Sequence, residues 1–169
     1  HRQSEDSTII TLAHDIKNQI ITKNLLDKQK DRNFILCSND LILENLKFII
    51  MNALEKGFSL DKIQVLAPMY KGEVGIDNIN SYLQSCLNPQ DDEKKEIRHF
   101  NKIFRIGDKV IQLVNRPEKN IMNGDIGYIK HIISNDENEE NVELIIDVDN
   151  NEVKFQESEL NEISLAYCI

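Results

Sequence analysis

Two hydrophobic patterns alternate along the first ninety residues. In three stretches apolar residues recur at three- and four-residue steps, a spacing that places them on one face of an α-helix. These stretches predict amphipathic helices over residues 4–17, from Ser38-Asn39-Asp40 to Gly57, and over residues 76–87. Ser4 or Asp6 is the expected N-cap of the first helix, and Asn88-Pro89 ends the last one. Residues 18–32 predict a further helix that frays into a loop.

Two short runs between these helices are mainly apolar. Phe34–Cys37 and Lys62–Ala67 are too short for helices and predict buried strands. An α-β-α-β-α order with short connections indicates parallel strands that helices cover, with right-handed crossovers. Two strands do not make a stable domain, so further strands are needed. Leu165–Ile169 is one candidate. We therefore expect an α/β lobe.

The pattern changes to short strands and turns at about residue 104. Strands are predicted over residues 109–114, 126–133, 144–148 and 153–155. Asn123-Gly124-Asp125 reads as a turn that needs a positive φ at Gly124. Four or five strands in about sixty residues predict a small β-barrel. This barrel is expected over residues 104–163, inserted in a lobe formed by residues 1–103 and 164–169.

Composition excludes several classes of protein. The 169 residues contain 40% apolar and 29% charged residues, and they include no apolar run of the roughly 20 residues that a membrane span needs. Nothing resembling a signal peptide follows the N-terminus. The three cysteines, Cys37, Cys86 and Cys168, lack metal-binding spacing and suit reduced thiols. We therefore expect a cytoplasmic protein without a metal site or a membrane contact.

Charge is unevenly distributed along the chain. The net charge is −9, which argues against bulk electrostatic coating of nucleic acid. Residues 94–131, here called the basic strip, hold nine Lys or Arg against four acids. Residues 136–162, the acidic stretch, hold eleven acids against Lys154 alone. Such asymmetry indicates either solvated faces or a basic surface that contacts a polyanion.

One stretch combines a strand with candidate chemistry. The run Gln64-Val65-Leu66-Ala67-Pro68-Met69-Tyr70-Lys71-Gly72 ends a predicted strand in an aromatic residue, a cation and a glycine. In open α/β sheets the carboxyl edge of the strands is where ligands bind. The alternative is a turn with a solvated lysine. Phosphate loops of Walker type, zinc spacings, nucleophile elbows and His-Glu-x-x-His motifs are all missing from the sequence.

Several motifs in order resemble one known family. They are Arg2-Gln3, the Gln64–Gly72 run, Asn78-Ile79-Asn80-x-x-Leu83-Gln84, Phe104-Arg105-x-Gly107-Asp108-Lys109-Val110, Asn123-Gly124-Asp125-x-Gly127 and Leu165-Ala166-Tyr167. Together they resemble the second RecA-like lobe, with its SH3-like insert, of the RecD-like superfamily 1 DNA helicases, the exodeoxyribonuclease V α-subunit type. The resemblance covers essentially the whole chain. It implies a partial RecA-like parallel-sheet lobe with an inserted SH3-like β-barrel.

The resemblance also implies roles for individual residues. Arg2 matches the motif IV arginine that reaches the γ-phosphate of ATP as an arginine finger, and Gln3 would help to position the nucleotide. Tyr70, Lys71 and Gly72 match the loop that faces the DNA groove between the lobes. The further residues expected at single-stranded DNA are Asn80, Arg105, Lys109, Arg116 and Lys119. ATP and Mg²⁺ are expected cofactors of the parent enzyme, with none on this chain alone.

The family translocates 5′ to 3′ with two lobes that close on ATP. The expected partners are single-stranded DNA and an N-terminal RecA-like lobe of the same polypeptide, and the resemblance leaves other subunits of a nuclease complex open. This chain has no aromatic residue before Arg2 and no Thr-x-His-Lys run after its last predicted strand. We therefore expect a piece of a larger motor that does not hydrolyse ATP alone. The alternative is a non-enzymatic module that binds nucleic acid or protein through the small barrel or the acidic stretch.

Overall fold

The computed structural model describes residues 7–21, 23–92, 94–133 and 142–169. The chain divides into two compact units, His1–Ser38 and Asn39–Ile169, and each is described by itself. No helix in the described part of the chain is long and apolar enough to cross a membrane.

The described part of the first unit contains one helix, α1 (Thr8–Lys17), which begins later than the sequence suggested. Its N-cap is Ser7, whose hydroxyl accepts a hydrogen bond from the Ile9 N–H (3.3 Å). The Asp31 carboxylate accepts hydrogen bonds from the Ser7 hydroxyl (2.9 Å) and from the Thr8 N–H and hydroxyl. The Thr8 hydroxyl contributes most to lowering the pKa of Asp31 to about 2. The expected caps Ser4 and Asp6 lie outside the described residues.

Two expectations for the first unit are wrong. The described part of residues 18–32 forms turns rather than a helix, and its Asp31 carboxylate accepts hydrogen bonds at the start of α1. Phe34–Cys37 forms no strand, since no strand among the described residues pairs with it. The side chains of Phe34 and Leu36 are 51% and 89% exposed. An apolar run becomes a strand only where a partner supplies hydrogen bonds.

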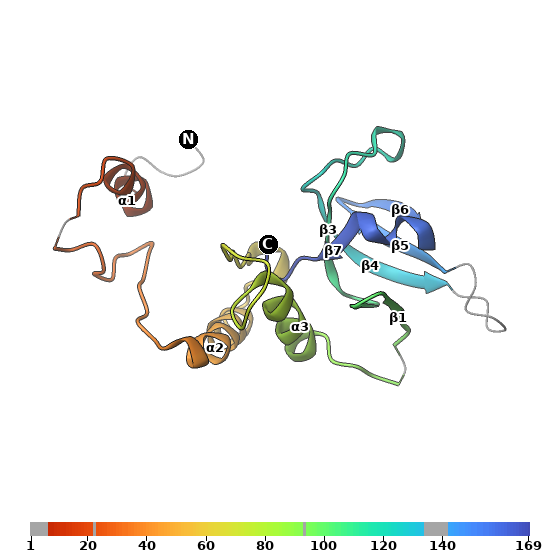
Figure 1. Ribbon diagram of the computed structural model, residues 1–169, viewed down its shortest axis with the longest axis horizontal. Coiled ribbons are helices and arrows are strands. Elements are labelled where there is room, and N and C mark those ends of the chain that lie inside the picture. The colour runs from red at the N-terminus through yellow and green to blue at the C-terminus, as the bar shows by residue number, and fades with distance from the viewer. Residues whose placement is uncertain (1–6, 22, 93, 134–141) are drawn as a thin grey trace. The chain divides into compact units, whose positions relative to one another are not determined.

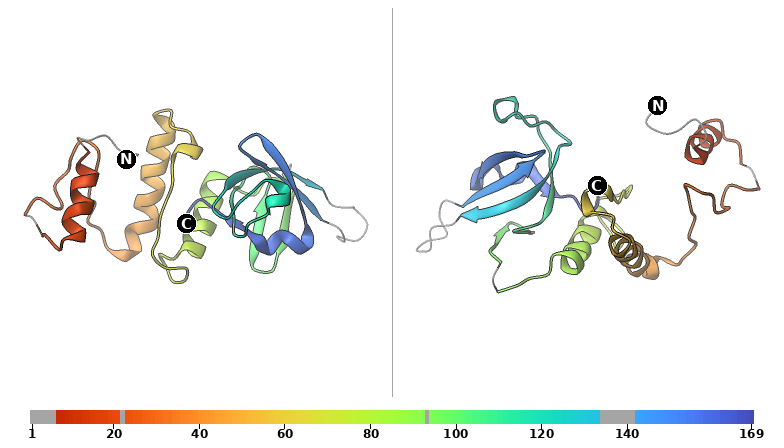
Figure 2. Two further views of the ribbon diagram at one scale, coloured as in Figure 1. Left: turned by 90° about the horizontal axis from the view of Figure 1, so that it is seen from above. Right: turned by 180° about the vertical axis from the view of Figure 1, so that it is seen from behind.

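The second unit begins with the two helices that periodicity predicted. A 3₁₀ turn (Asn39–Leu41) leads into α2 (Ile42–Glu55), and α3 (Ile76–Leu87) follows a second 3₁₀ turn (Leu60–Lys62). Ile50 of α2 and Ile79 and Leu83 of α3 are buried. α3 lies between α2 and the five-stranded sheet (Figure 1 and Figure 2). This position allows α3 to contact both parts of the unit.

The expected parallel sheet is reduced to one bridge among the described residues. Val65 pairs in parallel with Cys168, through an Ile169 N–H to Val65 carbonyl bond and an Ala67 N–H to Ile169 carbonyl bond, both 3.1 Å. The half-buried Ile63, Val65 and Ala67 alternate with exposed residues, as one-sided strands do. The C-terminal residues therefore lie beside the central run, but a RecA-like parallel sheet is not confirmed.

Antiparallel strands form the rest of the second unit. A hairpin pairs β1 (Glu96–His99) with β2 (Lys102–Arg105), and a five-stranded sheet has the order β6-β5-β4-β3-β7. Its strands are β3 (Lys109–Gln112), β4 (Ile126–Ile133), β5 (Glu143–Val148), β6 (Asn151–Gln156) and β7 (Ile163–Leu165). Its core contains Val110, Ile129, Leu144, Ile146 and Phe155, which are each at most 1% exposed.

The five-stranded sheet is open among the described residues, so the expected SH3-like β-barrel is not seen as a closed barrel. β6 and β7 are its two edges, and the 3₁₀ turn Glu157–Glu162 joins them without pairing them. β7 pairs with β3 and then continues toward Val65, which takes it away from β6. The expected turn at Gly124 is confirmed, with φ +97°. The domain boundaries at residues 103 and 163 remain a prediction.

Candidate nucleic-acid interface

A folded-back loop presents the aromatic residue and the cation that the sequence singled out. Residues 68–75, here called the Tyr70 loop, lead from the Val65 bridge into α3. The Met69 and Tyr70 carbonyls accept the first free N–H groups of the helix, from Ile76 (2.8 Å) and Asp77 (3.1 Å). The start of α3 is thereby capped by the loop itself, and the loop conformation is tied to the helix.

Gly75 lets this loop close tightly. A Cβ at Gly75 would lie 2.6–2.7 Å from backbone atoms of Lys71 and Tyr70, which is closer than real Cβ contacts. The side chains point the other way: Tyr70 is 74% exposed, and Lys71 is exposed with no ionic partner in the part of the chain described. Gly72 adopts φ +105° in open space. The loop thus offers an aromatic face, a free cation and bare backbone.

Asn80 lies inside the second unit rather than on its surface. It is 4% exposed, its amide donates to the Cys168 carbonyl (2.8 Å), and its amide oxygen accepts the Cys168 N–H (2.9 Å). Both polar ends of the side chain are therefore used by the backbone. This geometry gives Asn80 the task of holding the C-terminal residues against α3.

Arg105 is also engaged internally. Its side chain is 10% exposed, its Nε donates to Glu96 (2.7 Å), and Nη1 donates to the Asn88 carbonyl (3.2 Å). The ion pair links the two strands of the β1–β2 hairpin, where Glu96 and Arg105 are cross-strand partners. Arg105 therefore anchors the hairpin to the end of α3.

The sequence did not single out Asp108 as the centre of a buried network. Asp108 is 0% exposed, and its carboxylate accepts four hydrogen bonds. The donors are the Gln84 amide (2.6 Å), the Asn88 amide (2.8 Å), the Arg105 N–H (2.7 Å) and the Tyr167 hydroxyl (2.9 Å). Burial raises the pKa of Asp108, and these bonds oppose the rise. The sequence features that could have indicated this network are the Gly107-Asp108 turn and Tyr167, but no periodicity connects them.

Lys109 is buried as well, at 2% exposure. Its ammonium donates to the Leu60 and Ile63 carbonyls (3.3 and 2.8 Å) and to the Gln64 side-chain oxygen (3.1 Å). Burial lowers the pKa of Lys109. All three of its donors are used, so the side chain fastens β3 to the segment before Val65.

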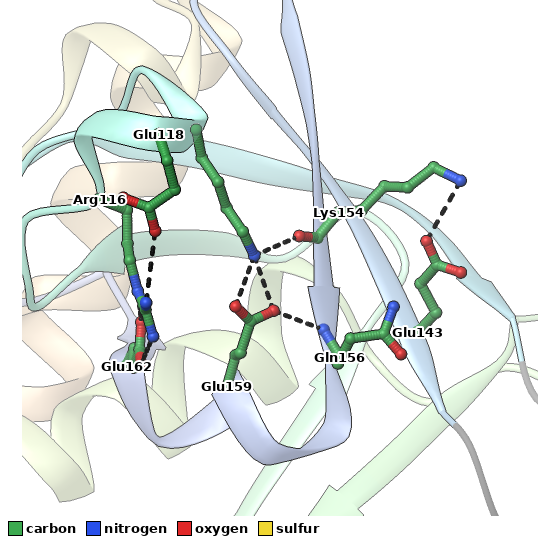
Figure 3. Close-up of polar contacts among 8 residues, drawn as sticks. Arg116, Glu118, Glu143, Lys154, Gln156, Glu159 and Glu162 are labelled. Carbon is green, nitrogen blue, oxygen red and sulfur yellow. Dashed lines mark hydrogen bonds and ion pairs between the residues drawn. The ribbon is translucent and has the colours of Figure 1, made fainter.

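Arg116 and Lys119 form ion pairs with the acidic stretch (Figure 3). Arg116 donates through Nε (2.7 Å) and Nη2 to Glu162, and its Nη1 lies 3.3 Å from Glu118. Lys119 donates to both Glu159 oxygens (2.7 Å each) and lies 4.8 Å from the centre of the Phe155 ring. The Arg116 hydrogen bond is the main cause of the lowered pKa of Glu162.

The basic strip and the acidic stretch therefore neutralise each other in part. Lys130 pairs with Asp147 (3.1 Å), in addition to the pairs of Arg116 and Lys119. Among the described cations of the strip, only Lys95 and Arg98 have neither an acidic partner nor a hydrogen bond from the side chain. The structure thus brings the Tyr70 loop to the surface but leaves Asn80, Arg105, Lys109, Arg116 and Lys119 in internal contacts.

The two residues expected at the nucleotide, Arg2 and Gln3, are outside the described residues. In the described ranges no three His, Cys, Asp or Glu side chains gather where they could hold a metal ion.

The sequence of this chain is similar to those of known DNA helicases. Residues 79–148 match the SH3 domain of ATP-dependent RecD-like DNA helicases. The ATP-dependent RecD2 DNA helicase of Deinococcus radiodurans is 33% identical over 107 residues, which make up 63% of this chain and 14% of that protein. The chain is thus similar to RecD-like helicases, over residues 79–148 in the family's SH3 domain and over the 107 residues shared with RecD2. The resemblance seen in the motifs is thereby confirmed.

One solved structure has a similar fold. It comes from a study of DNA unwinding at forked double-stranded DNA by two coordinating Pif1 helicases. The match covers 100% of this RecD-like chain and 38% of the Pif1 chain, with a TM-score of 0.53 at 17% identity. The matched SH3 domain of the RecD-like family begins within α3 and ends with β5. The Asp108 network, which joins α3 to the β2–β3 turn, lies inside that range except for Tyr167.

Proposed function

We propose that this RecD-like chain is part of an ATP-dependent DNA helicase and contacts single-stranded DNA through the Tyr70 loop. The similarity to the RecD2 helicase supports a helicase as the parent protein. The observation that carries the proposal is the exposed Tyr70–Gly72 segment, which α3 and the Val65 bridge hold in place.

Each part of the segment has a suitable chemistry. The unpaired ammonium of Lys71 neutralises a phosphate, and the positive φ of Gly72 lets backbone approach the strand without a Cβ. The exposed ring of Tyr70 stacks on a base. Such contacts bind a strand with little regard to its sequence, as a translocating enzyme requires.

The nucleotide role belongs to Arg2 and Gln3. In the parent enzyme, ATP with Mg²⁺ would lie between an N-terminal RecA-like lobe and this chain. The Arg2 guanidinium would stabilise charge that develops on the departing phosphate, with Gln3 beside it. The chain alone lacks the nucleotide-cradling lobe and would not turn over ATP. Movement along the strand would run 5′ to 3′.

Binding to an oligothymidine strand tests the DNA contact. Fluorescence anisotropy over a salt series should show weak binding of the full chain that falls steeply with salt. Lys71→Ala should weaken binding and reduce the slope of log K against log salt by about 0.7, the value for one lost single-strand phosphate contact. Lys56→Ala is the matched control, since Lys56 is another exposed lysine of the same unit. A Lys71→Ala slope equal to that of the control removes the loop from the DNA site.

ATP turnover tests the arginine role in the parent polypeptide. Arg2→Ala should lower DNA-stimulated turnover by about a thousandfold or more while nucleotide affinity stays nearly unchanged. Lys17→Ala, a cation at the end of α1, is the control. Equal turnover in both variants would eliminate Arg2 as an arginine finger.

The competing function is a non-enzymatic module that binds nucleic acid or protein. An acidic docking face would have to use Asp149, Glu152 and Glu157, since Glu143, Glu159 and Glu162 are already paired with cations. Binding of DNA without any stimulation of the parent's ATP turnover would favour the module.

A further inference from the structure

The uncompensated positive charge of the basic strip lies on the β1–β2 hairpin. Lys95 precedes β1, and Arg98 lies within it; both are exposed and without a partner among the described residues. The cations that follow in β2 and beyond donate to carbonyls or carboxylates. A polyanion would therefore meet its first free charges at this hairpin.

The tip of the hairpin carries an exposed aromatic ring. Phe100 is 83% exposed and adopts φ +52°, a backbone conformation that is uncommon for an aromatic residue. The His99 ring contacts it edge-on, with centroids 4.6 Å apart. Because Arg98 and the ring lie within three residues, the tip pairs a cation with a stacking surface.

A cavity of about 270 Å³ with mixed polar and apolar lining lies between part of this hairpin and α3. Its lining includes Asp77, Ser81 and Ser85 of α3, and Asn101, Lys102 and Arg105 of the hairpin. The only acceptor recorded for the Lys102 ammonium within the described residues is the Ile163 carbonyl (3.0 Å). Hydroxyl, amide and ammonium groups line the space together with the Asp77 carboxylate, so its wall offers hydrogen bonds to a strand that passes it.

Asp77 connects the hairpin tip to the Tyr70 loop. The Asp77 N–H donates a hydrogen bond to the Tyr70 carbonyl (3.1 Å). Asp77 also lines the cavity, together with Asn101 and Lys102. The loop and the tip are therefore at the same end of α3, with the cavity next to both. A strand that contacts Lys71 can continue past the cavity to Phe100.

We infer that the β1–β2 hairpin is a second contact for the same single strand: Lys95 and Arg98 bind phosphates, and Phe100 stacks on a base. This inference rests on the proposed function of the Tyr70 loop. An exposed ring that follows two exposed cations fits single-stranded nucleic acid, where stacking and charge act together. A protein partner would need a continuous apolar patch.

The test uses the full chain and the same oligothymidine salt series. The double variant Lys95→Gln/Arg98→Gln should lower the slope of log K against log salt by about 1.4, which corresponds to two phosphate contacts. Lys130→Gln/Lys154→Gln is the matched control, because both lysines are exposed but paired with Asp147 and Glu143. Phe100→Ala should weaken binding about 5-fold or more, Phe100→Tyr should retain it, and Phe48→Ala, which removes another exposed ring, should have no effect.

The outcomes separate the two proposals. If the hairpin variants keep the wild-type slope and affinity while Lys71→Ala weakens binding, the hairpin inference is overturned and the function of the Tyr70 loop stands. If the wild-type chain does not bind the strand at all, both fall. Unfolding curves in urea, unchanged for the hairpin variants, show that lost binding is not lost fold.

Discussion

The Tyr167 hydroxyl donates a 2.9 Å hydrogen bond to the Asp108 carboxylate, and both residues are almost fully buried. They are 59 positions apart in the chain. Tyr167 belongs to the C-terminal segment that leads to the Val65 bridge, whereas Asp108 precedes β3. Together with Gln84 and Asn88, the pair fastens α3, the sheet and the C-terminal segment to one another. The geometry of the Tyr70 loop, which depends on α3, therefore depends on Asp108.

Replacing Asp108 should destabilise the second unit strongly. Asp108→Asn puts an amide donor where donors already point, so we expect the free energy of unfolding to fall by about 2–4 kcal/mol. Tyr167→Phe removes a single donor and should cost about 1 kcal/mol. Urea unfolding measures both. Asp149→Asn makes the same chemical change in an exposed turn and should be nearly neutral; an equal loss there would contradict the network.

Lys109 should matter for stability and not for DNA. Lys109→Met keeps the length of the side chain but leaves the Ile63 and Leu60 carbonyls without their donor. We expect a loss of about 2–3 kcal/mol in unfolding free energy. The salt slope of oligothymidine binding should stay at its wild-type value. Lys130→Met, at an exposed pair, serves as the control. A reduced slope for Lys109→Met alone would return Lys109 to the DNA contact.

Helices and turns could be predicted because their signals are local. The apolar periodicity of α2 and α3 and the Gly124 turn each depend on a few neighbouring residues. Strands are different, because their hydrogen bonds come from distant segments. Phe34–Cys37 has the composition of a strand but no partner, whereas Ile163–Leu165 pairs with β3.

Which candidate residues are exposed could be predicted only for those that lie in a loop. Tyr70 and Lys71 come directly after a strand-like run and a proline, and the structure leaves them exposed. Lys109 reads as a surface cation because lysines are rarely buried, and only the contacts with Leu60 and Ile63 explain its position. The neutralisation of Arg116 likewise depends on Glu162, 46 residues away.

The ion pairs of the acidic stretch make stability depend on pH. The pKa of Glu162 is lowered chiefly by the Arg116 hydrogen bond. Burial raises the pKa of Glu159, but the hydrogen bonds from Lys119 and the Gln156 N–H and the charges of Lys119 and Arg116 lower it by more, so the pKa is lowered overall. A carboxyl with a lower pKa in the folded state binds fewer protons there, so its contribution is complete above the unfolded pKa and is lost as pH falls.

We therefore expect the urea midpoint to drop as pH falls below about 4.5, the ordinary value for glutamate. The double variant Glu159→Gln/Glu162→Gln should be less stable at pH 7 and should show a smaller drop. Glu55→Gln, at the end of α2, should keep the wild-type profile. If the urea midpoint of the double variant drops as much as that of the wild type, other carboxyl groups cause the loss of stability at acid pH.

Gly75→Ala tests whether the shape of the Tyr70 loop, and not only its charge, determines binding. The added methyl group would meet the Lys71 and Tyr70 backbone at 2.6–2.7 Å, and backbone cannot rotate away as a side chain can. The loop must shift, so affinity for oligothymidine should fall although Tyr70 and Lys71 are intact. Because the ammonium remains, the salt slope should change less than in Lys71→Ala. Gly57→Ala adds a methyl group in open space after α2, at a φ of +87° that strains an alanine, and should bind as the wild type does because it leaves the Tyr70 loop untouched. If the Gly75 and Gly57 variants bind oligothymidine equally well, DNA binding tolerates a displaced loop. The Tyr70 loop would then contribute to binding through its charge alone.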